Sequence, residues 1–354
     1  MRYDYYTCSL DPSLRLGAEF HVPDVPRPLC LFFHGWHMTA EQSRKAGAIS
    51  PLLPEFFVVN VDMRGRGGSS GVPDASGFEL IDGLDALEHA RRTWPHLVED
   101  TAGPFAVGGS GGGGNVLALV GKAPDTFAAA VSWAGMSDYA LWYREDSAGV
   151  YRDEMDVWIG GPPDENPEGY LSRGGLHVLD NLLTPLLLVH GRNDVAVPVR
   201  HTEEYVRRSR SLGKAQVKVH YNDSGHDSAE WPLMLEHLRT HRRPPEIPRR
   251  GRFLVHGFLA CRPFRLILED PSRMGRIEYR LDDSRRLIEL HFVQQAGAAA
   301  TECATLILDT DANRAMFTDA KGNCGEVLPE STPRGHIFRL TCRAPWSLKI
   351  GRKG

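Results

Sequence analysis

The stretch Phe105 to Gly114 constrains the fold of this chain more than any other, because an apolar run leads directly into a serine set among glycines. Ser110 has a glycine two residues before it and two residues after it, at Gly108 and Gly112. A side chain held at the tip of a sharp turn between a strand and a helix leaves no room for a Cβ atom at these flanking positions. We therefore predict that Ser110 stands on such a turn as a nucleophile.

Two other interpretations of this stretch have to be weighed. One is a glycine-rich loop without a chemical role. The other is a dinucleotide-binding loop, because Gly109, Gly111 and Gly114 also fit its glycine spacing. That loop requires an acidic residue at the end of the next strand, and the next apolar run, Phe127 to Trp133, is followed by Ala134-Gly135. The residues that follow later in the chain decide between the three.

Short apolar runs alternate with amphipathic segments as far as residue 242, which predicts an α/β fold: a mostly parallel sheet with helices on both faces. Residues 136–183 interrupt the alternation with many Trp, Tyr, Gly and Pro residues and are expected to form a cap-like excursion above the sheet. Strands are predicted at 3–10, 14–22, 30–33, 56–61, 105–107, 128–133, 186–190 and 217–221, and helices at 40–52, 78–94, 199–212 and 228–238 and directly after Ser110.

A change of pattern after residue 242 predicts a second domain. Residues 243–250 are charged and rich in proline, and we expect a stiff linker that holds the two domains apart. Residues 251–354 contain short, partly alternating apolar runs, typical of a small antiparallel β-sandwich. Its strands are predicted at 253–259, 264–268, 276–281, 287–293, 305–308, 337–341 and 347–350. This part carries 16 Lys and Arg against 12 Asp and Glu, whereas the whole chain has a net charge of −4. The predicted catalytic domain is therefore residues 1–242.

A serine hydroxyl becomes a useful nucleophile when a base lies within hydrogen-bond reach and a third group orients that base. In a sheet of this kind the carboxylate and the histidine follow the serine along the chain, each after a strand. Asp194 follows one predicted strand and His226 follows the next. The alternatives are a turn residue for Asp194 and a surface histidine for His226, but their order favours a Ser110, Asp194 and His226 triad. Asp223 and Asp227 share the loop of His226 and fit the role of the carboxylate less well.

Hydrolysis through such a serine also requires two donors for the oxyanion of the intermediate. Gly111, directly after the nucleophile, and Trp36, after the His34-Gly35 pair at an earlier strand end, are the candidates for these backbone N–H groups. The alternative role for Trp36 is that of an aromatic residue in the core. Trp133, Trp142 and Trp158 are candidate substrate-binding residues, with packing as the alternative.

The glycine-rich segment 62–71 follows the predicted strand at 56–61. It lacks the Gly-Lys-Ser/Thr ending of a phosphate-binding loop, so a structural role is favoured. We expect Asp62 and Arg64 to pair with each other and to hold the floor of the active site.

These motifs carry a family resemblance. Ser110 in Gly-Gly-Ser-Gly-Gly, Asp194 in His-Gly-Arg-Asn-Asp-Val-Ala-Val-Pro and His226 in Ser-Gly-His resemble the α/β-hydrolase superfamily, in particular the catalytic domains of prolyl-oligopeptidase-like and acetyl-xylan-esterase-like members. The run from Asp62 to Gly71 is similar to a segment common in those families. The resemblance covers residues 1–242, and it implies a serine hydrolase fold with this triad and no cofactor.

The sequence predicts a hydrolase of carboxylic esters, acting on a small-molecule or polymeric ester. The aromatic residues near the predicted mouth favour an apolar or aromatic acyl group, such as that of a cell-wall ester or a polyester. The alternative is a serine peptidase of the aminopeptidase or dipeptidase type. The ester is favoured because fewer than 30 residues precede the strand of the His-Gly motif, and because the excursion shows no acidic pair for a peptide amino terminus. A binding or scaffolding protein with an unused hydrolase core is a further alternative.

Composition excludes several other classes. A net charge of −4 without a clustered basic face argues against nucleic acid, and no apolar run approaches the length of a membrane span. The N-terminus lacks the pattern of a secretion signal, so we expect a cytoplasmic protein or a secreted one whose signal has been removed. The six cysteines form no C-x-x-C pair, so no metal is predicted, although four of them lie after residue 250 and leave one or two disulfides open. The β domain could dock a polymer or cover the active-site mouth, and the oligomeric state stays open.

Overall fold

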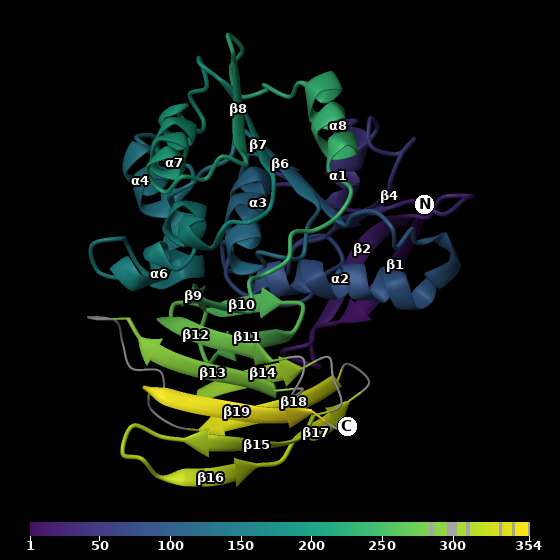
Figure 1. The fold of residues 1–354 in the computed structure, drawn as a ribbon. Helices are drawn as coiled ribbons and strands as arrows, with labels where there is room; N and C mark the ends of the chain where they lie inside the picture. The colour runs from purple at the N-terminus through teal and green to yellow at the C-terminus, as the bar shows by residue number, and fades with distance from the viewer. Residues whose placement is uncertain (283–286, 296–302, 309–311, 333–334, 342–343, 353–354) are drawn as a thin grey trace.

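The computed structural model describes residues 1–282, 287–295, 303–308, 312–332, 335–341 and 344–352. These residues form two β-sheets, an eight-stranded mixed sheet with helices around it and an eleven-stranded antiparallel sheet at the C-terminus (Figure 1). The mixed sheet carries the predicted triad, and the second sheet packs below it in the view of Figure 1.

The mixed sheet has the strand order β1-β2-β4-β3-β5-β6-β7-β8. Strands β3 to β8 are parallel to one another, whereas β1 and β2 pair antiparallel with each other and β2 pairs antiparallel with β4. The central strands are almost entirely apolar, with Asn60 and His190 as polar exceptions, and they are buried on both faces, as a covered parallel sheet requires. The strands are β1 (Arg2–Thr7), β2 (Arg15–His21), β3 (Leu29–Phe33), β4 (Phe57–Val61), β5 (Phe105–Gly109), β6 (Ala129–Trp133), β7 (Leu186–Gly191) and β8 (Val217–Asn222).

Helices cover both faces of this sheet, as the sequence predicted. Alternate residues of β3 enter two separate core clusters, because successive side chains of a strand point to opposite faces. Helices α2, α3 and α7 contribute to the larger cluster, and α8 together with Ile49 and Leu52 contributes to the other. The helices are α1 (Ala40–Lys45), α2 (Glu79–Thr93), α3 (Gly111–Lys122), α7 (Arg200–Ser211) and α8 (Trp231–Thr240), with a short turn of helix η1 (Pro95–Leu97).

The segment between β6 and β7 forms a compact group of short helices rather than a further sheet layer. It has an apolar cluster of its own, in which Tyr139, Trp142 and Tyr170 are buried and Trp36 packs from the loop after β3. This segment therefore lies against the C-terminal end of the parallel strands. Its elements are α4 (Tyr139–Glu145), α5 (Arg152–Met155), η2 (Asp156–Gly160), α6 (Pro167–Leu171) and η3 (Gly175–Asn181).

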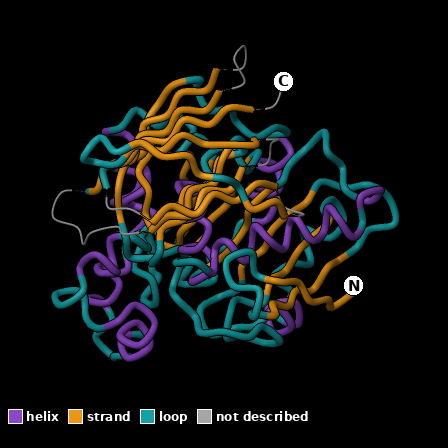
Figure 2. The backbone as a smooth tube through the Cα atoms, turned by 90° about the horizontal axis from the view of Figure 1, so that it is seen from below, coloured by secondary structure: helices purple, strands orange, loops and turns teal. Residues whose placement is uncertain are grey.

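The C-terminal sheet, which we name the β unit, is antiparallel and strongly curved. Its strand order is β16-β15-β19-β13-β12-β9-β10-β11-β14-β18-β17, and β15 and β16 also contact β18 from the other side of the sheet. Figure 2 shows the curved strands from below. The strands are β9 (Arg250–His256), β10 (Phe258–Cys261), β11 (Phe264–Leu268), β12 (Met274–Asp282), β13 (Leu287–Gln294), β14 (Cys303–Leu308), β15 (Ala312–Thr318), β16 (Cys324–Val327), β17 (Glu330–Thr332), β18 (Gly335–Thr341) and β19 (Trp346–Arg352).

The β unit packs directly on the α/β part, so the expectation that a stiff linker holds the two apart is wrong. Phe258 and Ile267 of the β unit belong to the same apolar cluster as helices α2 and α3. The side chain of Asn181 also joins the two parts, because it accepts a hydrogen bond from the N–H of Leu254 and donates one to its carbonyl oxygen, both at 2.8 Å. The proline-rich segment merely bridges two bodies that share a core.

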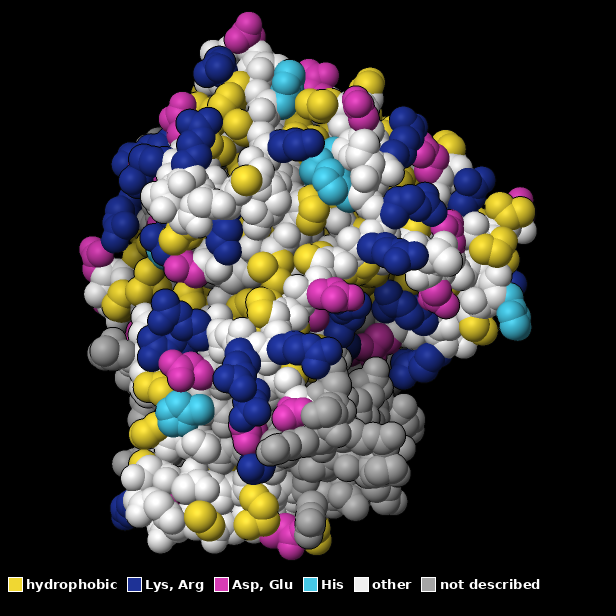
Figure 3. Space-filling model, viewed as in Figure 1, with side chains coloured by type: hydrophobic (Ala, Val, Ile, Leu, Met, Phe, Trp, Pro, Cys, Tyr) yellow, Lys and Arg dark blue, Asp and Glu magenta, His cyan; other side chains and the backbone are white. Residues whose placement is uncertain are grey.

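The surface charges, the helices and the cysteines can be compared with what composition indicates about nucleic-acid binding, membrane spans and disulfides. On the face shown in Figure 3, Lys and Arg side chains are interspersed with Asp and Glu. Within the described residues, none of the helices combines the length and the apolar character that crossing a bilayer requires. The cysteines of the described part have free thiols, and Cys342 lies outside that part.

Candidate active site

Ser110 stands on the turn between β5 and α3 in a conformation that side chains rarely adopt, with φ 55° and ψ −123°. The two flanking glycines explain how the turn fits. A Cβ atom on Gly108 would lie 2.3 Å from the carbonyl oxygen of Gly112, and one on Gly112 would lie 2.0 Å from that of Phe33. The N–H of Ser110 donates to the carbonyl oxygen of Trp133 on the neighbouring strand, at 3.0 Å. Such strain persists only where the surroundings fix it, and it is typical of functional positions.

His226 and Asp194 meet at the same edge of the sheet, because they follow the adjacent parallel strands β8 and β7. Nδ1 of His226 lies 2.8 Å from Oδ2 of Asp194, which leaves Nε2 of the ring available for another partner. The Asp194 side chain is fully buried, whereas 37% of the His226 side chain is exposed. A buried carboxylate that holds one imidazole nitrogen is the arrangement that orients a catalytic base.

The carboxylate of Asp194 is stabilised from several directions. Its Oδ1 accepts hydrogen bonds from the N–H groups of Ala196 and Val197, at 2.9 and 3.0 Å. Nε2 of the buried His190 lies 3.4 Å from Oδ2. Burial alone would raise the pKa of Asp194, but the hydrogen bonds from His190, His226 and Val197 outweigh burial and lower the pKa well below its usual range. Asp194 is therefore charged at neutral pH.

The backbone N–H groups of Trp36 and Gly111 lie close together beside Ser110. A Cβ atom on Gly111 would be 2.7 Å from the backbone nitrogen of Trp36, and one on Gly35 would be 4.0 Å from Cβ of Ser110. Gly111 is also the first residue of α3, where the helix dipole favours negative charge. These two donors fit the requirements of an oxyanion hole.

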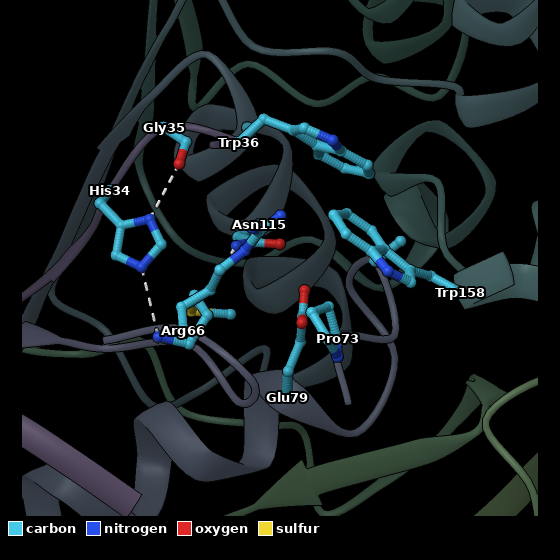
Figure 4. Close-up of a pocket in the computed structure, with 11 residues that line it drawn as sticks. His34, Gly35, Trp36, Arg66, Pro73, Glu79, Asn115 and Trp158 are labelled. Carbon is cyan, nitrogen blue, oxygen red and sulfur yellow. Dashed lines mark hydrogen bonds between the residues drawn. The ribbon is translucent and has the colours of Figure 1, made fainter. Parts of the chain in front are cut away.

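His34 fixes the loop that carries Trp36. Its Nε2 accepts the N–H of Met63 at 3.3 Å, so its Nδ1 carries the proton and donates to the carbonyl oxygen of Gly35 at 2.8 Å (Figure 4). Burial lowers the pKa of His34, which keeps the ring neutral and suits it to this double role. The His-Gly pair of the sequence thus joins the loop after β3 to the loop after β4.

A narrow pocket opens beside Gly111 and Trp36. Figure 4 shows the rings of Trp36 and Trp158 near each other on one side of the pocket, with Glu79 reaching toward it from below. The ring centroids of the two tryptophans are 4.9 Å apart. The residues that line the pocket are His34, Gly35, Trp36, Met63, Arg66, Pro73, Ala75, Glu79, Gly111, Asn115 and Trp158.

Comparison with known proteins agrees with this geometry. Residues 82–239 match the prolyl oligopeptidase family. This match spans a little less than half of the chain, and it includes Ser110, Asp194 and His226. An uncharacterised peptidase of Bacillus subtilis, YtmA, is 27% identical over 225 residues, which cover 63% of this chain and 85% of YtmA.

Solved structures give the fold, which is that of the α/β-hydrolases. An acylaminoacyl peptidase of Pyrococcus horikoshii superposes with a TM-score of 0.55 and 20% identity over 70% of this chain, but over only 42% of the peptidase. The esterase Pf2001 of Pyrococcus furiosus superposes with a TM-score of 0.53 and 16% identity, over 68% of this chain and 91% of the esterase. The solved structures that share this fold thus include a peptidase and an esterase.

The three candidate tryptophans lie in three different environments. Trp158 lines the pocket. Trp142 is buried, its indole N–H donates to the carbonyl oxygen of Ala196 at 2.9 Å, and its ring packs edge-on against Trp36. Trp133 packs against Trp231. Of the three tryptophans, Trp158 lines the pocket. Trp133 and Trp142 instead pack against other aromatic side chains, which fits the alternative interpretation of these two residues as packing residues.

The prediction that Asp62 pairs with Arg64 is wrong. Asp62 accepts hydrogen bonds from the hydroxyl of Tyr3 at 2.6 Å and from the N–H of Ala40 at 2.7 Å. Arg64 instead binds both carboxylate oxygens of Asp82 at 2.7 Å. The two residues brace the loop after β4 against different elements, because their side chains leave the turn in different directions.

Sequence reasoning missed three polar residues of the pocket, which are Arg66, Glu79 and Asn115. Arg66 belongs to the glycine-rich segment that was assigned a structural role, and Glu79 is the first residue of a predicted amphipathic helix. Asn115 follows the nucleophile by five residues, within α3. Only the position of Asn115 in the first turns after the nucleophile offered a signal, since that part of the helix must lie near the reacting group.

Proposed function

We propose that this protein is a serine hydrolase that cleaves carboxylic esters through an acyl-enzyme on Ser110. The observation that carries the proposal is the 2.8 Å contact between His226 and the buried Asp194, on the same sheet edge as the strained Ser110 turn. A base oriented in this way and a serine held on a sharp turn are the parts that nucleophilic catalysis requires.

The steps follow from the placement of these groups. Ser110 Oγ attacks the ester carbonyl and gives its proton to Nε2 of His226, while Asp194 stabilises the imidazolium. The N–H groups of Gly111 and Trp36 bind the oxyanion. His226 then passes the proton to the leaving alcohol, and a water molecule activated by the same ring releases the acid and restores Ser110.

An ester fits the surroundings of the site better than an extended peptide does. The pocket beside Gly111 and Trp36 is narrow, whereas the His226 side chain, which serves the leaving group, is 37% exposed. The narrow pocket selects the acyl group. The solvent-exposed side near His226 accepts many leaving groups. An alcohol is also expelled more easily than an amine, since it depends less on prior protonation.

A fluorophosphonate probe and a p-nitrophenyl ester test the proposal together. We expect the probe to label the protein, and Ser110→Ala to abolish labelling and to lower kcat for the ester at least about 10⁴-fold. Ser9→Ala, outside the site, is the matched control and should keep both the labelling by the probe and the turnover of the ester. Undiminished labelling of Ser110→Ala, or ester turnover that survives it, would overturn the assignment of the nucleophile.

Peptide hydrolysis is the second candidate function. Two of the proteins compared above are named as peptidases, and the same triad can cleave an amide. Aminoacyl and dipeptidyl p-nitroanilides, measured beside p-nitrophenyl esters, separate the two functions. Strong cleavage of the anilides with negligible cleavage of the esters would replace the first proposal by the second.

A further inference from the structure

The topology assigns the pocket to the acyl side of the proposed reaction. Ser110 follows the central strand β5, His226 and Asp194 follow β8 and β7 on one side of it, and the pocket is lined from the loops after β3 and β4 on the other. The leaving group must face His226, which protonates it. The acyl group therefore extends away from His226, toward the pocket beside Trp36.

Arg66 brings an unused hydrogen-bond donor into this pocket. Its Nη2 atom is buried and has no hydrogen-bond partner among the described residues, and the nearest carboxylate oxygen, Oε1 of Glu154, lies 3.9 Å away. The other oxygen of Glu154 is engaged by the indole N–H of Trp36 at 2.5 Å and by His37 at 2.7 Å. A buried guanidinium nitrogen without an acceptor costs free energy, unless a ligand supplies one.

Asn115 adds a second weakly used donor. Its Oδ1 accepts the hydroxyl of Ser76 at 2.6 Å, which directs its amide group elsewhere. Among the described residues, the hydrogen bond of that amide is to the sulfur of Met63, at 3.9 Å, and sulfur is a weak acceptor. Arg66 and Asn115 therefore bring donors into the pocket that lack good acceptors among the described residues.

Glu79 forms the floor of the pocket and is 5% exposed. Its two oxygens accept the N–H groups of Ser76 at 2.7 Å and of Asp74 at 3.3 Å. Burial, together with the charge of Asp74, raises the pKa of Glu79 to about 7. A carboxyl group that carries its proton near neutral pH is a third donor.

The charged and titratable groups around Glu79 come from every neighbouring element. Asp74 and Arg64 act on it from the loops before α2. Lys122 of α3, Arg173 after α6 and Tyr139 of α4 face it as well. Three of these five neighbours are basic side chains, and burial lowers the pKa of one of them, Lys122, to about 7, so that Lys122 titrates in the same range as Glu79.

We propose that this pocket selects an acyl group that ends in a carboxylate, held by Arg66 and by the carboxyl group of Glu79. The inference rests on the proposed ester hydrolysis and names its substrate class. A carboxylate supplies four acceptor sites to the three donors, and Trp36 and Trp158 cover the apolar part of the chain. A cationic group fits poorly, because the Arg66 guanidinium already lies 4.8 Å over the Trp158 ring.

A pH-dependent preference follows. Below pH 7, Glu79 carries a proton and donates to the bound carboxylate. Above pH 7, Glu79 is an anion and repels it. The preference for an acidic acyl group over a neutral one should therefore fall as pH rises through about 7, by roughly tenfold, which corresponds to an interaction of one pKa unit between the two carboxyl groups.

Three p-nitrophenyl esters of nearly equal shape test this preference, the monoadipate, the adipamate and the 6-methylheptanoate. Their acyl chains end in a carboxylate, an amide and an isopropyl group. With spontaneous hydrolysis subtracted, we expect kcat/KM at pH 6 to be at least tenfold higher for the monoadipate than for the other two. The ratio of monoadipate to adipamate cancels the titration of His226, and it should decline between pH 6 and pH 8.5. Equal or greater turnover of the adipamate at pH 6 would overturn the proposal.

Variants assign the effect to the named residues. Arg66→Met should lower the ratio about tenfold at every pH, and Glu79→Gln should make the ratio independent of pH, because an amide N–H donates throughout. Arg144→Met is the matched control, since Arg144 pairs with the exposed Asp164 on the excursion and does not line the pocket. A pH slope that persists in Glu79→Gln would transfer the titration to another group, such as Lys122, and would overturn the role of Glu79.

Binding to the Ser110→Ala variant separates this inference from the proposed function. Monomethyl adipate should bind that variant at pH 6, seen by calorimetry or by quenching of tryptophan fluorescence, and about tenfold more weakly at pH 8.5. Dimethyl adipate is the neutral control and should bind weakly at both pH values. Binding without ester turnover in the wild type would leave the subsite standing and refute the reaction, whereas turnover without selective binding would refute the subsite.

Discussion

The Asp194 carboxylate is fully buried, yet the His226 ring that it contacts at 2.8 Å is 37% exposed. The buried carboxylate of Asp194 therefore fixes the position of the more exposed His226 ring. Asp194 is held by backbone N–H groups of its own turn, and the histidine loop closes over it from β8. The orientation of the ring should depend on this single carboxylate oxygen.

Asp194→Asn tests that dependence. Oδ1 at position 194 should keep the N–H groups of Ala196 and Val197, so that the new amide N–H₂ faces Nδ1 of His226 and forces the wrong tautomer. We expect kcat for a p-nitrophenyl ester to fall about 10⁴-fold with the fold intact. Asp223→Asn, on the loop of His226, is the control and should retain activity. Equal losses in both variants would show that another carboxylate orients the ring.

Gly112→Ala tests the tight approach of α3 to β3. A Cβ atom at this position would lie 2.0 Å from the carbonyl oxygen of Phe33, so the helix must shift and carry Ser110 with it. We expect a loss of stability of about 2–4 kcal/mol and a fall in kcat of at least about 100-fold. Urea unfolding and ester kinetics measure the two effects.

Gly325→Ala is the matched control for that substitution. An added Cβ at Gly325 of β16 meets nothing within 4 Å, and its φ lies outside the left-handed region. This variant should match the wild type in both stability and turnover. A mild phenotype for Gly112→Ala would mean that the turn tolerates a wider geometry than the structure indicates.

Local patterns explain what was predictable. The turn at Ser110 follows from glycine spacing, and the pairing of His226 with Asp194 follows from the rule that parallel strands end at one sheet edge. In the β unit, the strand predicted at 253–259 is split into β9 and β10 by Gly257, whose φ of 72° breaks the ladder. Strands β15 to β17 were missed because their sequences alternate poorly between apolar and polar residues.

The pocket was not predictable, because its polar residues come from three segments without a common signal. Glu79 looks like an ordinary N-terminal helix residue, since acidic groups are favoured there for their own sake. Its place on the pocket floor depends on the loop around Ala75 and Ser76, which both have left-handed backbones, with φ of 51° and 65°. No sequence pattern predicts that an alanine adopts a left-handed backbone conformation.

Arg173 connects that loop to the β unit. Its guanidinium donates to the carbonyl oxygen of Asp74 at 2.9 Å and to the hydroxyl of Ser272 at 2.9 Å, and its side chain is almost fully buried. Arg173→Met should cost about 3 kcal/mol by leaving these partners unsatisfied. Because the loop also carries pocket residues, KM should rise more than kcat falls.

Arg208→Met controls for the loss of an arginine. The Arg208 side chain is 42% exposed and pairs with the equally exposed Asp180, so the change should alter stability by less than about 1 kcal/mol. Thermal unfolding and steady-state kinetics on both variants supply the comparison. A stability loss in Arg173→Met with KM unchanged would mean that the β unit supports the fold but not the pocket.

His256 should make the protein sensitive to acid. The ring is 3% exposed at the end of β9, and burial, with the charge of Lys122, lowers its pKa to about 3 from the ordinary value of 6.5. Between these values the unfolded chain binds a proton that the folded chain does not. The free energy of unfolding should therefore fall with decreasing pH below 6.5, by up to about 1.4 kcal/mol per pH unit from this group.

His256→Gln removes this group, and His96→Gln removes an exposed histidine from η1 as a control. Urea unfolding at pH 6.5, 5.5 and 4.5 should show a shallower decline for His256→Gln than for the wild type, whereas His96→Gln should follow the wild type. Since two other buried histidines, His34 and His237, have lowered pKa values as well, a residual slope is expected in His256→Gln. Parallel lines for all three proteins would show that His256 takes up its proton without unfolding the chain, through an opening of the contact between β9 and α6.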